Sequence, residues 1–513
     1  MKLEIYDTTL RDGAQRTGIS FSLSDKLRIA QKLAEIGFDF VEGGWSGSNP
    51  KDAKFFKKVK NLNLGKTIVC DFTMTSKDKK NLFSALNSGT KVITVVGKTW
   101  DLQVKEVLKI SLKENLSLIK DTCKFFSSNK KRVFFDAEHF FDGFKSNPDY
   151  AIKCLKSAQE GKAERIILCD TNGGTLSWEV AEIIREVKKK IKVPLGIHAH
   201  NDSGLAVANT LVAVKEGVLQ VQGTINGYGE RCGNADLCQV IPNLQLKMGY
   251  YCLPKEKLSL LTELSKYVAE IANISPDPWQ PFVGANAFSH KGGIHADAIL
   301  KWEKSYQHID PSLVGNFSKI VVSELSGKGN VLAKAKEFGI SLNKKQAKKI
   351  AKKIKELENK GFHFEGADAS LELLIRKTLF EKKPFFEVLN FKVFLESKYS
   401  KIISNANVKL KVKNKIVQTT ANGNGPVNAL DRAIKKGLLL FYPQLKNVNL
   451  TDYKVRILDG KKGTAAKVRV LIESSDKKGN RWYTVGASTN IVEASWQALS
   501  DSYEYFLLRS QKI

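Results

Sequence analysis

The chain has 513 residues, of which 42% are hydrophobic and 26% charged, and its formal net charge is +29. This length and composition are typical of a soluble globular protein with about two to four domains. The sequence contains no run of about 18 apolar residues, which argues against a membrane span. Its seven cysteines form no Cys-x-x-Cys pair, which argues against a disulfide framework and favours a location in the reducing cytoplasm.

The basic charge raises the alternative of a nucleic-acid-binding protein. However, the lysines are spread along helical segments, as at residues 344–349 and 352–353, without interleaved aromatic residues. The sequence also shows no helix-turn-helix, RRM or KH signature. We therefore interpret the lysines as solvated helix faces and expect neither nucleic acid nor a membrane as a partner.

Eight strand-like runs occupy the first 230 residues, and most are followed by an amphipathic stretch such as 24–36, where Ser24 is the expected N-cap. Eight such repeats predict an α/β fold of the (β/α)8 TIM barrel type. The alternative, a doubly wound open sheet, usually has about five to seven strands and a Gly-rich first turn, whereas the first turn here is DTTLRDG, residues 7–13. The runs are 3–6, 38–42, 67–70, 91–96, 132–136, 165–169, 194–199 and 218–224.

Polar side chains gather at the C-terminal ends of these runs, where barrel enzymes place their active sites. A single residue of this kind could be structural, but the convergence of the whole set predicts a functional site. The set comprises Asp7, Arg11, Asp12, Glu42, Asp136, Glu138, His139, Asp170, Thr171, Asn172, His198, His200, Asn226, Glu230, Arg231 and Asn234.

Two of these residues suggest a metal. His198 and His200 follow the apolar run 193–197, and residues two apart on a strand point to the same side. Their imidazoles are thus aimed at one point, as metal ligands must be, and Asp12 is the strongest acidic candidate to join them. A pair of histidines satisfied by hydrogen bonds at a strand end is the alternative.

The character of the chain changes after the Pro-rich segment 275–281. We expect a barrel domain over 1–275, a mostly helical linker over 276–387 and an α+β domain over 388–513. In the last domain, strands within 407–420, a turn at 421–426 and a helix at 427–440 are followed by strands at 453–458, 465–474 and 481–487 and a helix from residue 491. This order suggests an internal duplication with a regulatory or a dimerisation role.

Four motifs, at residues 7–15, 198–202, 229–234 and 292–297, resemble in sequence and order those of the 2-isopropylmalate, homocitrate and citramalate synthase family. The resemblance covers essentially the whole chain. Residues 42–52 (EGGWSGSNPKD) resemble one citramalate synthase branch, whereas 2-isopropylmalate synthases more often have Glu-x-Gly-Phe-Pro there. The resemblance implies an acyltransferase that condenses acetyl-CoA with pyruvate to (R)-citramalate and free CoA, in isoleucine biosynthesis. The alternative within the family is 2-isopropylmalate synthesis from 2-oxoisovalerate.

The family pattern also implies roles for single residues. It places Asp12, His198, His200 and Asn234 around a divalent cation, for which Mg²⁺, Mn²⁺ and Zn²⁺ are all chemically suitable.

On the substrates, the pattern places Arg11 next to the alkoxide that develops during condensation. It assigns the oxo-acid carboxylate to Thr171 and places Glu138 near the reacting carbons.

The remaining implied residues lie outside the barrel. His295 matches the base that removes a methyl proton from acetyl-CoA, with Asp297 as its orienting or relay partner and Tyr306 as a site tyrosine. The resemblance further implies a homodimer with a composite active site, and a C-terminal domain that senses isoleucine.

Overall fold

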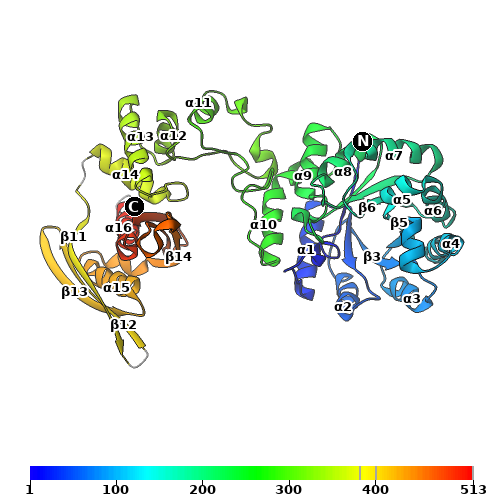
Figure 1. Ribbon diagram of the computed structural model, residues 1–513, viewed down its shortest axis with the longest axis horizontal. Helices are drawn as coiled ribbons and strands as arrows, with labels where there is room; N and C mark the ends of the chain where they lie inside the picture. The colour runs from blue at the N-terminus through cyan, green and yellow to red at the C-terminus, as the bar shows by residue number, and fades with distance from the viewer. Residues whose placement is uncertain (381–382, 399–400, 511–513) are drawn as a thin grey trace. The chain divides into compact units, whose positions relative to one another are not determined.

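A computed structural model describes residues 1–380, 383–398 and 401–510. The chain forms two compact units (Figure 1). The first comprises Met1–Phe288 with Ile309–Ser318, and the second comprises Ser289–His308 with Lys319–Ile513. Among the described helices, none combines the length and the apolarity that crossing a bilayer requires.

The first unit is a closed barrel of eight parallel strands in sequential order, with β1 paired to both β2 and β8. All eight predicted strands are confirmed, and closure excludes the open-sheet alternative. The strands are β1 (Glu4–Asp7), β2 (Phe40–Gly44), β3 (Ile68–Met74), β4 (Val92–Lys98), β5 (Arg132–Glu138), β6 (Arg165–Asp170), β7 (Leu195–Ala199) and β8 (Gln220–Gly223).

Helices surround the barrel and bury their apolar faces against it in one continuous core (Figure 1). The first of them is capped by Ser22, which forms a capping box with Asp25, so the expectation of Ser24 as its N-cap is wrong by two residues. The helices of this unit are α1 (Leu23–Ile36), α2 (Pro50–Val59), α3 (Lys79–Asn87), α4 (Leu112–Ser128), α5 (Phe140–Ser146), α6 (Pro148–Glu160), α7 (Ser177–Lys190), α8 (Ala206–Lys215), α9 (Leu237–Pro242) and α10 (Leu261–Ile271).

Aromatic rings fill the lumen of the barrel. Tyr6, Phe40 and Phe134 are buried together, and the Phe40 and Phe134 rings meet edge to face with centroids 5.1 Å apart. At the N-terminal end of the strands, Glu4 binds Arg165 through two hydrogen bonds. The lumen is therefore a packed core, and the polar strand ends above it form the floor of a cavity.

The second unit begins with a helical part that has its own apolar core. Its helices are α11 (Gly293–Lys301), α12 (Lys328–Glu337), α13 (Lys344–Asn359) and α14 (Asp368–Phe380), and its two short parallel strands are β9 (Ser289–His290) and β10 (Lys319–Ile320). The mostly helical character that the sequence predicts for this linker is confirmed.

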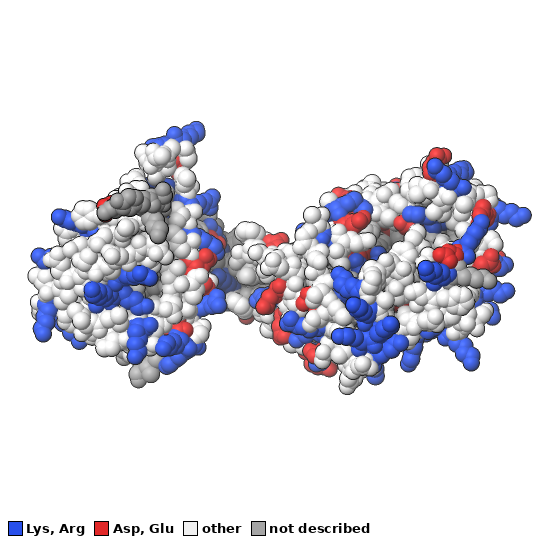
Figure 2. All heavy atoms as spheres, turned by 90° about the horizontal axis from the view of Figure 1, so that it is seen from below, with Lys and Arg blue, Asp and Glu red and all other residues white. Residues whose placement is uncertain are grey.

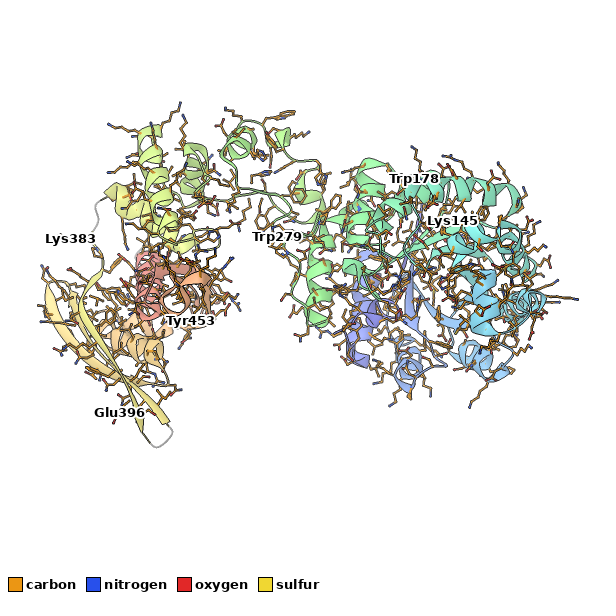
Figure 3. The ribbon with its side chains drawn as sticks, in the orientation of Figure 1. Lys145, Trp178, Trp279, Lys383, Glu396 and Tyr453 are labelled. Carbon is orange, nitrogen blue, oxygen red and sulfur yellow. The ribbon has the colours of Figure 1, made fainter. Side chains whose placement is uncertain are left out.

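The rest of the second unit confirms the duplication, because three antiparallel strands and a helix occur twice. Strand β13 continues to Gly423, so the predicted turn at 421–426 shrinks to two residues. The copies are β11 (Phe386–Lys398), β12 (Lys401–Val412), β13 (Lys415–Gly423) and α15 (Pro426–Leu439), then β14 (Asn449–Ile457), β15 (Val468–Ser475), β16 (Arg481–Ser488) and α16 (Ile491–Ser510). Tyr453 of β14 ties sheet to helix through a 2.6 Å hydrogen bond between its hydroxyl and Ser495 Oγ (Figure 3).

Lysine and arginine side chains are scattered over both units on the face drawn in Figure 2, with aspartate and glutamate between them. The lysines of α13 fit this distribution. Lys345, Lys348, Lys349 and Lys352 are exposed, whereas Ala347 and Ile350 of the same helix are buried. The helix therefore has one solvated, basic face and one apolar face against the core.

Candidate active site

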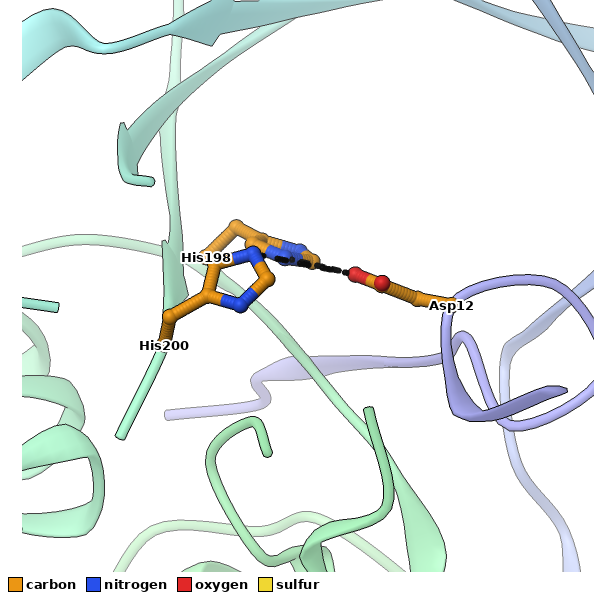
Figure 4. A group of neighbouring side chains, drawn as sticks. All are labelled: Asp12, His198 and His200. Carbon is orange, nitrogen blue, oxygen red and sulfur yellow. Dashed lines mark ion pairs between the residues drawn. The ribbon is translucent and has the colours of Figure 1, made fainter. Parts of the chain in front are cut away.

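The three residues that the sequence singles out as metal ligands lie together at the C-terminal ends of the strands. His198 is in β7, His200 follows that strand, and Asp12 lies in the turn after β1. Their ligand atoms all lie within 4.8 Å of one another. Figure 4 shows both rings facing the Asp12 carboxylate, whose Oδ2 is 3.1 Å from His198 Nε2 and 3.9 Å from His200 Nε2.

The protonation states of Asp12 and His200 suit a divalent cation. Burial would raise the pKa of Asp12, but the charge of Arg11 and a hydrogen bond from His198 hold it well below its ordinary value. Burial, helped by the neighbouring His198, lowers the pKa of His200 to about 4. At neutral pH the group thus offers a carboxylate and a neutral imidazole, which are the forms that bind metals.

Asn234 completes this set. Its Nδ2 donates to Asp12 Oδ2 over 2.8 Å and lies 3.1 Å from His198 Nε2. Its Oδ1 is buried and finds no hydrogen-bond partner among the described residues. Because the two ends of an amide are interchangeable by a half turn, Oδ1 can face the cluster when a cation replaces the hydrogen bond. A donor set of one carboxylate, two imidazoles and one amide oxygen fits a divalent cation.

Arg11 is fixed beside the cation site by two contacts. Its Nε donates to Glu42 Oε2 over 2.6 Å, and its guanidinium carbon lies 4.2 Å from the centroid of the Phe72 ring. Glu42 in turn accepts a hydrogen bond from the hydroxyl of Tyr6 in the barrel lumen. Arg11 is therefore held by a network that starts in the core, and it lines the cavity above.

Glu138 and Thr171 line the same cavity, which has a volume of about 440 Å³. Glu138 ends β5 and forms a 2.8 Å ion pair with Lys98 at the end of β4. Thr171 follows β6, and its hydroxyl accepts a hydrogen bond from the His139 amide. Arg11, Asp12, Glu138, Thr171, His198 and His200 thus share one cavity, and Asn234 is hydrogen-bonded to its wall.

The residues predicted to serve acetyl-CoA lie in the second unit. The His295 ring stacks on Tyr306 with centroids 4.1 Å apart, and both side chains are exposed. The Asp297 carboxylate forms an ion pair with Lys301, one turn further along α11. Residues two apart on a helix do not face each other, so this helix directs Asp297 toward Lys301 and not toward His295.

Sequence reasoning missed one residue that contacts a candidate ligand. Gln222 of β8 is fully buried, and its Oε1 lies 2.9 Å from His198 Nδ1. The sequence contained one signal that could have identified Gln222. Alternate residues of a barrel strand face the lumen, and in the run Gln220, Val221, Gln222 the two glutamines alternate with an apolar residue.

Fold and site together define a (β/α)8-barrel protein with a candidate divalent-cation site at the C-terminal ends of its strands. Models of three families match successive parts of the chain: HMGL-like over residues 2–268, homocitrate synthase post-HMGL domain-like over 282–361, and the LeuA allosteric (dimerisation) domain over 365–507. The chain belongs to the HMGL-like family.

Several relatives align with essentially the whole chain. An (R)-citramalate synthase of Geobacter sulfurreducens is 53% identical, with 100% of this chain and 98% of the relative covered. One from Aquifex aeolicus is 50% identical, with 100% and 99% covered. A 2-isopropylmalate synthase of Methanocaldococcus jannaschii is more distant, at 34% identity with 100% and 96% covered.

Proposed function

We propose that this protein is an (R)-citramalate synthase, which condenses acetyl-CoA with pyruvate and releases CoA. The observation that carries this proposal is the 44–53% identity, over essentially the whole chain, to five (R)-citramalate synthases from different organisms. The cavity of the barrel supports it, because it combines a candidate cation site with an arginine and a threonine hydroxyl of suitable chemistry.

In this proposal each barrel residue has a defined task. A divalent cation held by Asp12, His198, His200 and Asn234 would polarise the keto group of pyruvate as a Lewis acid.

Around the cation, Arg11 would donate hydrogen bonds to the oxygen that becomes an alkoxide as the new carbon–carbon bond forms. Thr171 would hydrogen-bond the pyruvate carboxylate. Glu138, whose charge is balanced by Lys98, would lie near the reacting carbons.

The acetyl group requires a base, because its methyl protons are weakly acidic. We propose His295 for this role. Its exposed ring, stacked on Tyr306, is available to a substrate. The Asp297 carboxylate forms an ion pair with Lys301. In this proposal the two residues together set the charge of α11 near His295. We further propose a homodimer in which His295 of one subunit serves the barrel of the other, supported by the match to the LeuA dimerisation domain.

A thiol-release assay with acetyl-CoA and a panel of 2-oxo acids tests this function. Each additional methylene in a small pocket is discriminated by only about 1–3 kcal/mol, so we expect pyruvate to be clearly better than 2-oxobutanoate and strongly better than 2-oxoisovalerate. Chelation should abolish CoA release, and Mg²⁺ or Mn²⁺ should restore it. Better turnover of 2-oxoisovalerate would reassign the chain to 2-isopropylmalate synthesis, and full activity in excess chelator would overturn the cation site.

We also propose that the duplicated C-terminal domain binds isoleucine as a feedback inhibitor, as the match to a LeuA allosteric domain supports. A cavity of about 430 Å³ lies between the two copies, and its lining combines the apolar Val427, Leu450 and Leu499 with polar residues that include Asp431. The apolar part suits a branched side chain, and the Asp431 carboxyl group suits an ammonium group. Amides at the start of α15 suit a carboxylate.

Calorimetric titration with isoleucine, leucine and valine tests the regulatory proposal. We expect heat from isoleucine and a matching decrease in CoA release, and substrate should reciprocally weaken isoleucine binding. No heat from any of the three, with CoA release unchanged, would leave the domain a dimerisation module.

The broader assignments are proposals as well. We propose domains over 1–275, 276–387 and 388–513, a place in isoleucine biosynthesis, and a cytoplasmic location. The last is supported by the seven cysteines, all of which are free thiols and six of which are buried.

A further inference from the structure

Gln222 joins a candidate metal ligand to a buried carboxyl group. It is the register partner of His198 across strands β7 and β8. Its Oε1 lies 2.9 Å from His198 Nδ1, and its Nε2 donates to Asp136 Oδ1 over 3.2 Å. All three side chains are buried, so each depends on the others for its hydrogen bonds.

The order of these contacts determines the tautomer of the histidine. Asp136 Oδ1 accepts a hydrogen bond, so it holds the NH₂ group of the Gln222 amide on its side and turns Oε1 toward His198. An amide oxygen can only accept, and Nδ1 of His198 must therefore carry a proton. Nε2, which lies 3.1 Å from the Asp12 carboxylate, is the ring nitrogen that remains for a cation.

We propose that Gln222, itself oriented by Asp136, is a positioning residue that presents His198 Nε2 to the cation. The inference rests on the cation site of the proposed function. Metal-bound histidines generally donate their second ring N–H to an acceptor, which fixes ring orientation and raises ligand basicity, and loss of that acceptor typically costs about 10–100-fold in metal affinity.

The same strand supplies a matched control. Gln220 is also fully buried and also faces the lumen, but its Nε2 donates to Glu4 Oε2 at 3.1 Å, at the opposite end of the barrel from the cavity. Glu4 keeps its two hydrogen bonds from Arg165 when Gln220 is replaced. Gln220→Met therefore reproduces the loss of a buried amide from β8 without touching His198.

A titration with Co²⁺ at pH 8, without substrate, tests the proposal. Calorimetry and visible absorption measure the binding. This pH lies above the pKa of Asp136, which burial, with a contribution from Glu42, raises to about 7. We expect Gln222→Met to weaken Co²⁺ binding by about 10–100-fold and Gln220→Met to leave it unchanged. The proton NMR spectrum of the Co²⁺ form should show a solvent-exchangeable imidazole N–H signal that is lost only in Gln222→Met.

A charge-neutral exchange provides a second test that does not depend on Gln222→Met folding. Gln222→Glu alone places two carboxyl groups side by side, at positions 222 and 136. Gln222→Glu combined with Asp136→Asn exchanges the two groups, so that the carboxylate at position 222 lies next to His198 and the amide lies at position 136. Because the double variant keeps an acceptor next to His198 Nδ1, it should bind Co²⁺ at least as tightly as wild type.

Equal Co²⁺ affinity in Gln222→Met and Gln220→Met would overturn the positioning role, as would a double variant that binds Co²⁺ at least about tenfold more weakly than wild type. A wild-type protein that binds no Co²⁺ would instead overturn the cation site itself.

Discussion

Arg11 shows how neighbouring side chains can prepare a residue for the role that we propose for it. Glu42 binds its Nε and Phe72 lies under its guanidinium, which leaves the terminal nitrogens on the side of the cavity, with Nη2 at 3.8 Å from Asp12 Oδ2. A lysine carries all its donors on one nitrogen and lacks the planar fork that lets Arg11 bind Glu42 through Nε and a substrate oxygen through a terminal nitrogen.

We therefore expect Arg11→Lys to lower kcat by about 10²–10³-fold, the usual cost of removing a donor to a developing oxyanion, with a small change in KM for pyruvate. Steady-state CoA release measures both constants. Arg16→Lys is the matched control, because Arg16 lies over the Tyr228 ring and does not line the cavity. An unchanged kcat in Arg11→Lys would remove Arg11 from the chemistry.

Asp71 in β3 is a buried acid outside the cavity lining. The Ser46 amide donates to its Oδ1, whereas its Oδ2 is buried without a partner in the described part of the chain. Burial raises the pKa of Asp71 to about 7. Between about pH 4 and pH 7 the folded protein therefore holds a proton that the unfolded chain releases, so this residue lowers the free energy of unfolding as pH rises through that window.

Asp71→Asn should remove this contribution. At about 1.4 kcal/mol per pKa unit, the stability of the variant relative to wild type should increase by about 2–3 kcal/mol between pH 5 and pH 8. Denaturant unfolding of both proteins at the two pH values measures the difference. A relative stability that is constant or decreases over this range would contradict a protonated Asp71.

At the scale of the elements, the start of α1 distinguishes between two candidate N-cap residues, Ser22 and Ser24. Ser22 Oγ accepts from the Asp25 amide, and Asp25 Oδ2 accepts from the Ser22 amide. Ser24 is exposed and lies within the first turn of the helix.

Ser22→Ala should therefore lower the free energy of unfolding by about 1 kcal/mol, as the loss of an N-cap usually does, whereas Ser24→Ala should change it by less than about 0.5 kcal/mol. Chemical denaturation of the two variants and wild type decides between the positions. A larger effect at Ser24 would restore the assignment made from the sequence.

The barrel was predictable because each of its elements repeats one simple pattern. Apolar runs recur eight times, most of them followed by an amphipathic stretch and most of them ending in a polar residue, and eight such repeats predict a closed barrel. The exact ends of the strands and helices were harder to predict from the sequence. The turn predicted at 421–426 contains strand residues up to Gly423, because cross-strand pairing with β12 extends β13 beyond the point where turn-forming residues begin.

The cation site was only partly predictable. His198 and His200 follow from strand periodicity, and Asp12 from its position after β1. The place of Asn234 depended on a resemblance, since an asparagine in a loop has many structural uses. Gln222 escaped notice because its role exists only through contacts with residues on two other strands.

At the scale of the whole molecule, the site depends on closure of the barrel. Asp12 and Asn234 are 222 residues apart in sequence, yet their side chains are hydrogen-bonded, because pairing of β1 with β8 brings the two ends of the barrel together. The residues proposed for acetyl-CoA lie in the other compact unit. In the proposed composite site, one subunit therefore supplies the cation ligands and the other supplies His295.

Mixing two inactive variants tests that claim. His200→Ala lacks a cation ligand but keeps His295, and His295→Ala has the opposite defect, so each homodimer should be inactive. After subunit exchange of an equal mixture, half of the dimers are mixed, and each mixed dimer contains one site with both histidines. CoA release should recover to about a quarter of the wild-type rate if two subunits share each site. If each subunit supplied both histidines to its own site, every site in the mixture would remain defective and no activity would return. A mixture of wild type with the double variant, His200→Ala combined with His295→Ala, controls for subunit exchange. If two subunits share each site, a mixed dimer of this kind has no intact site, so exchange should lower CoA release.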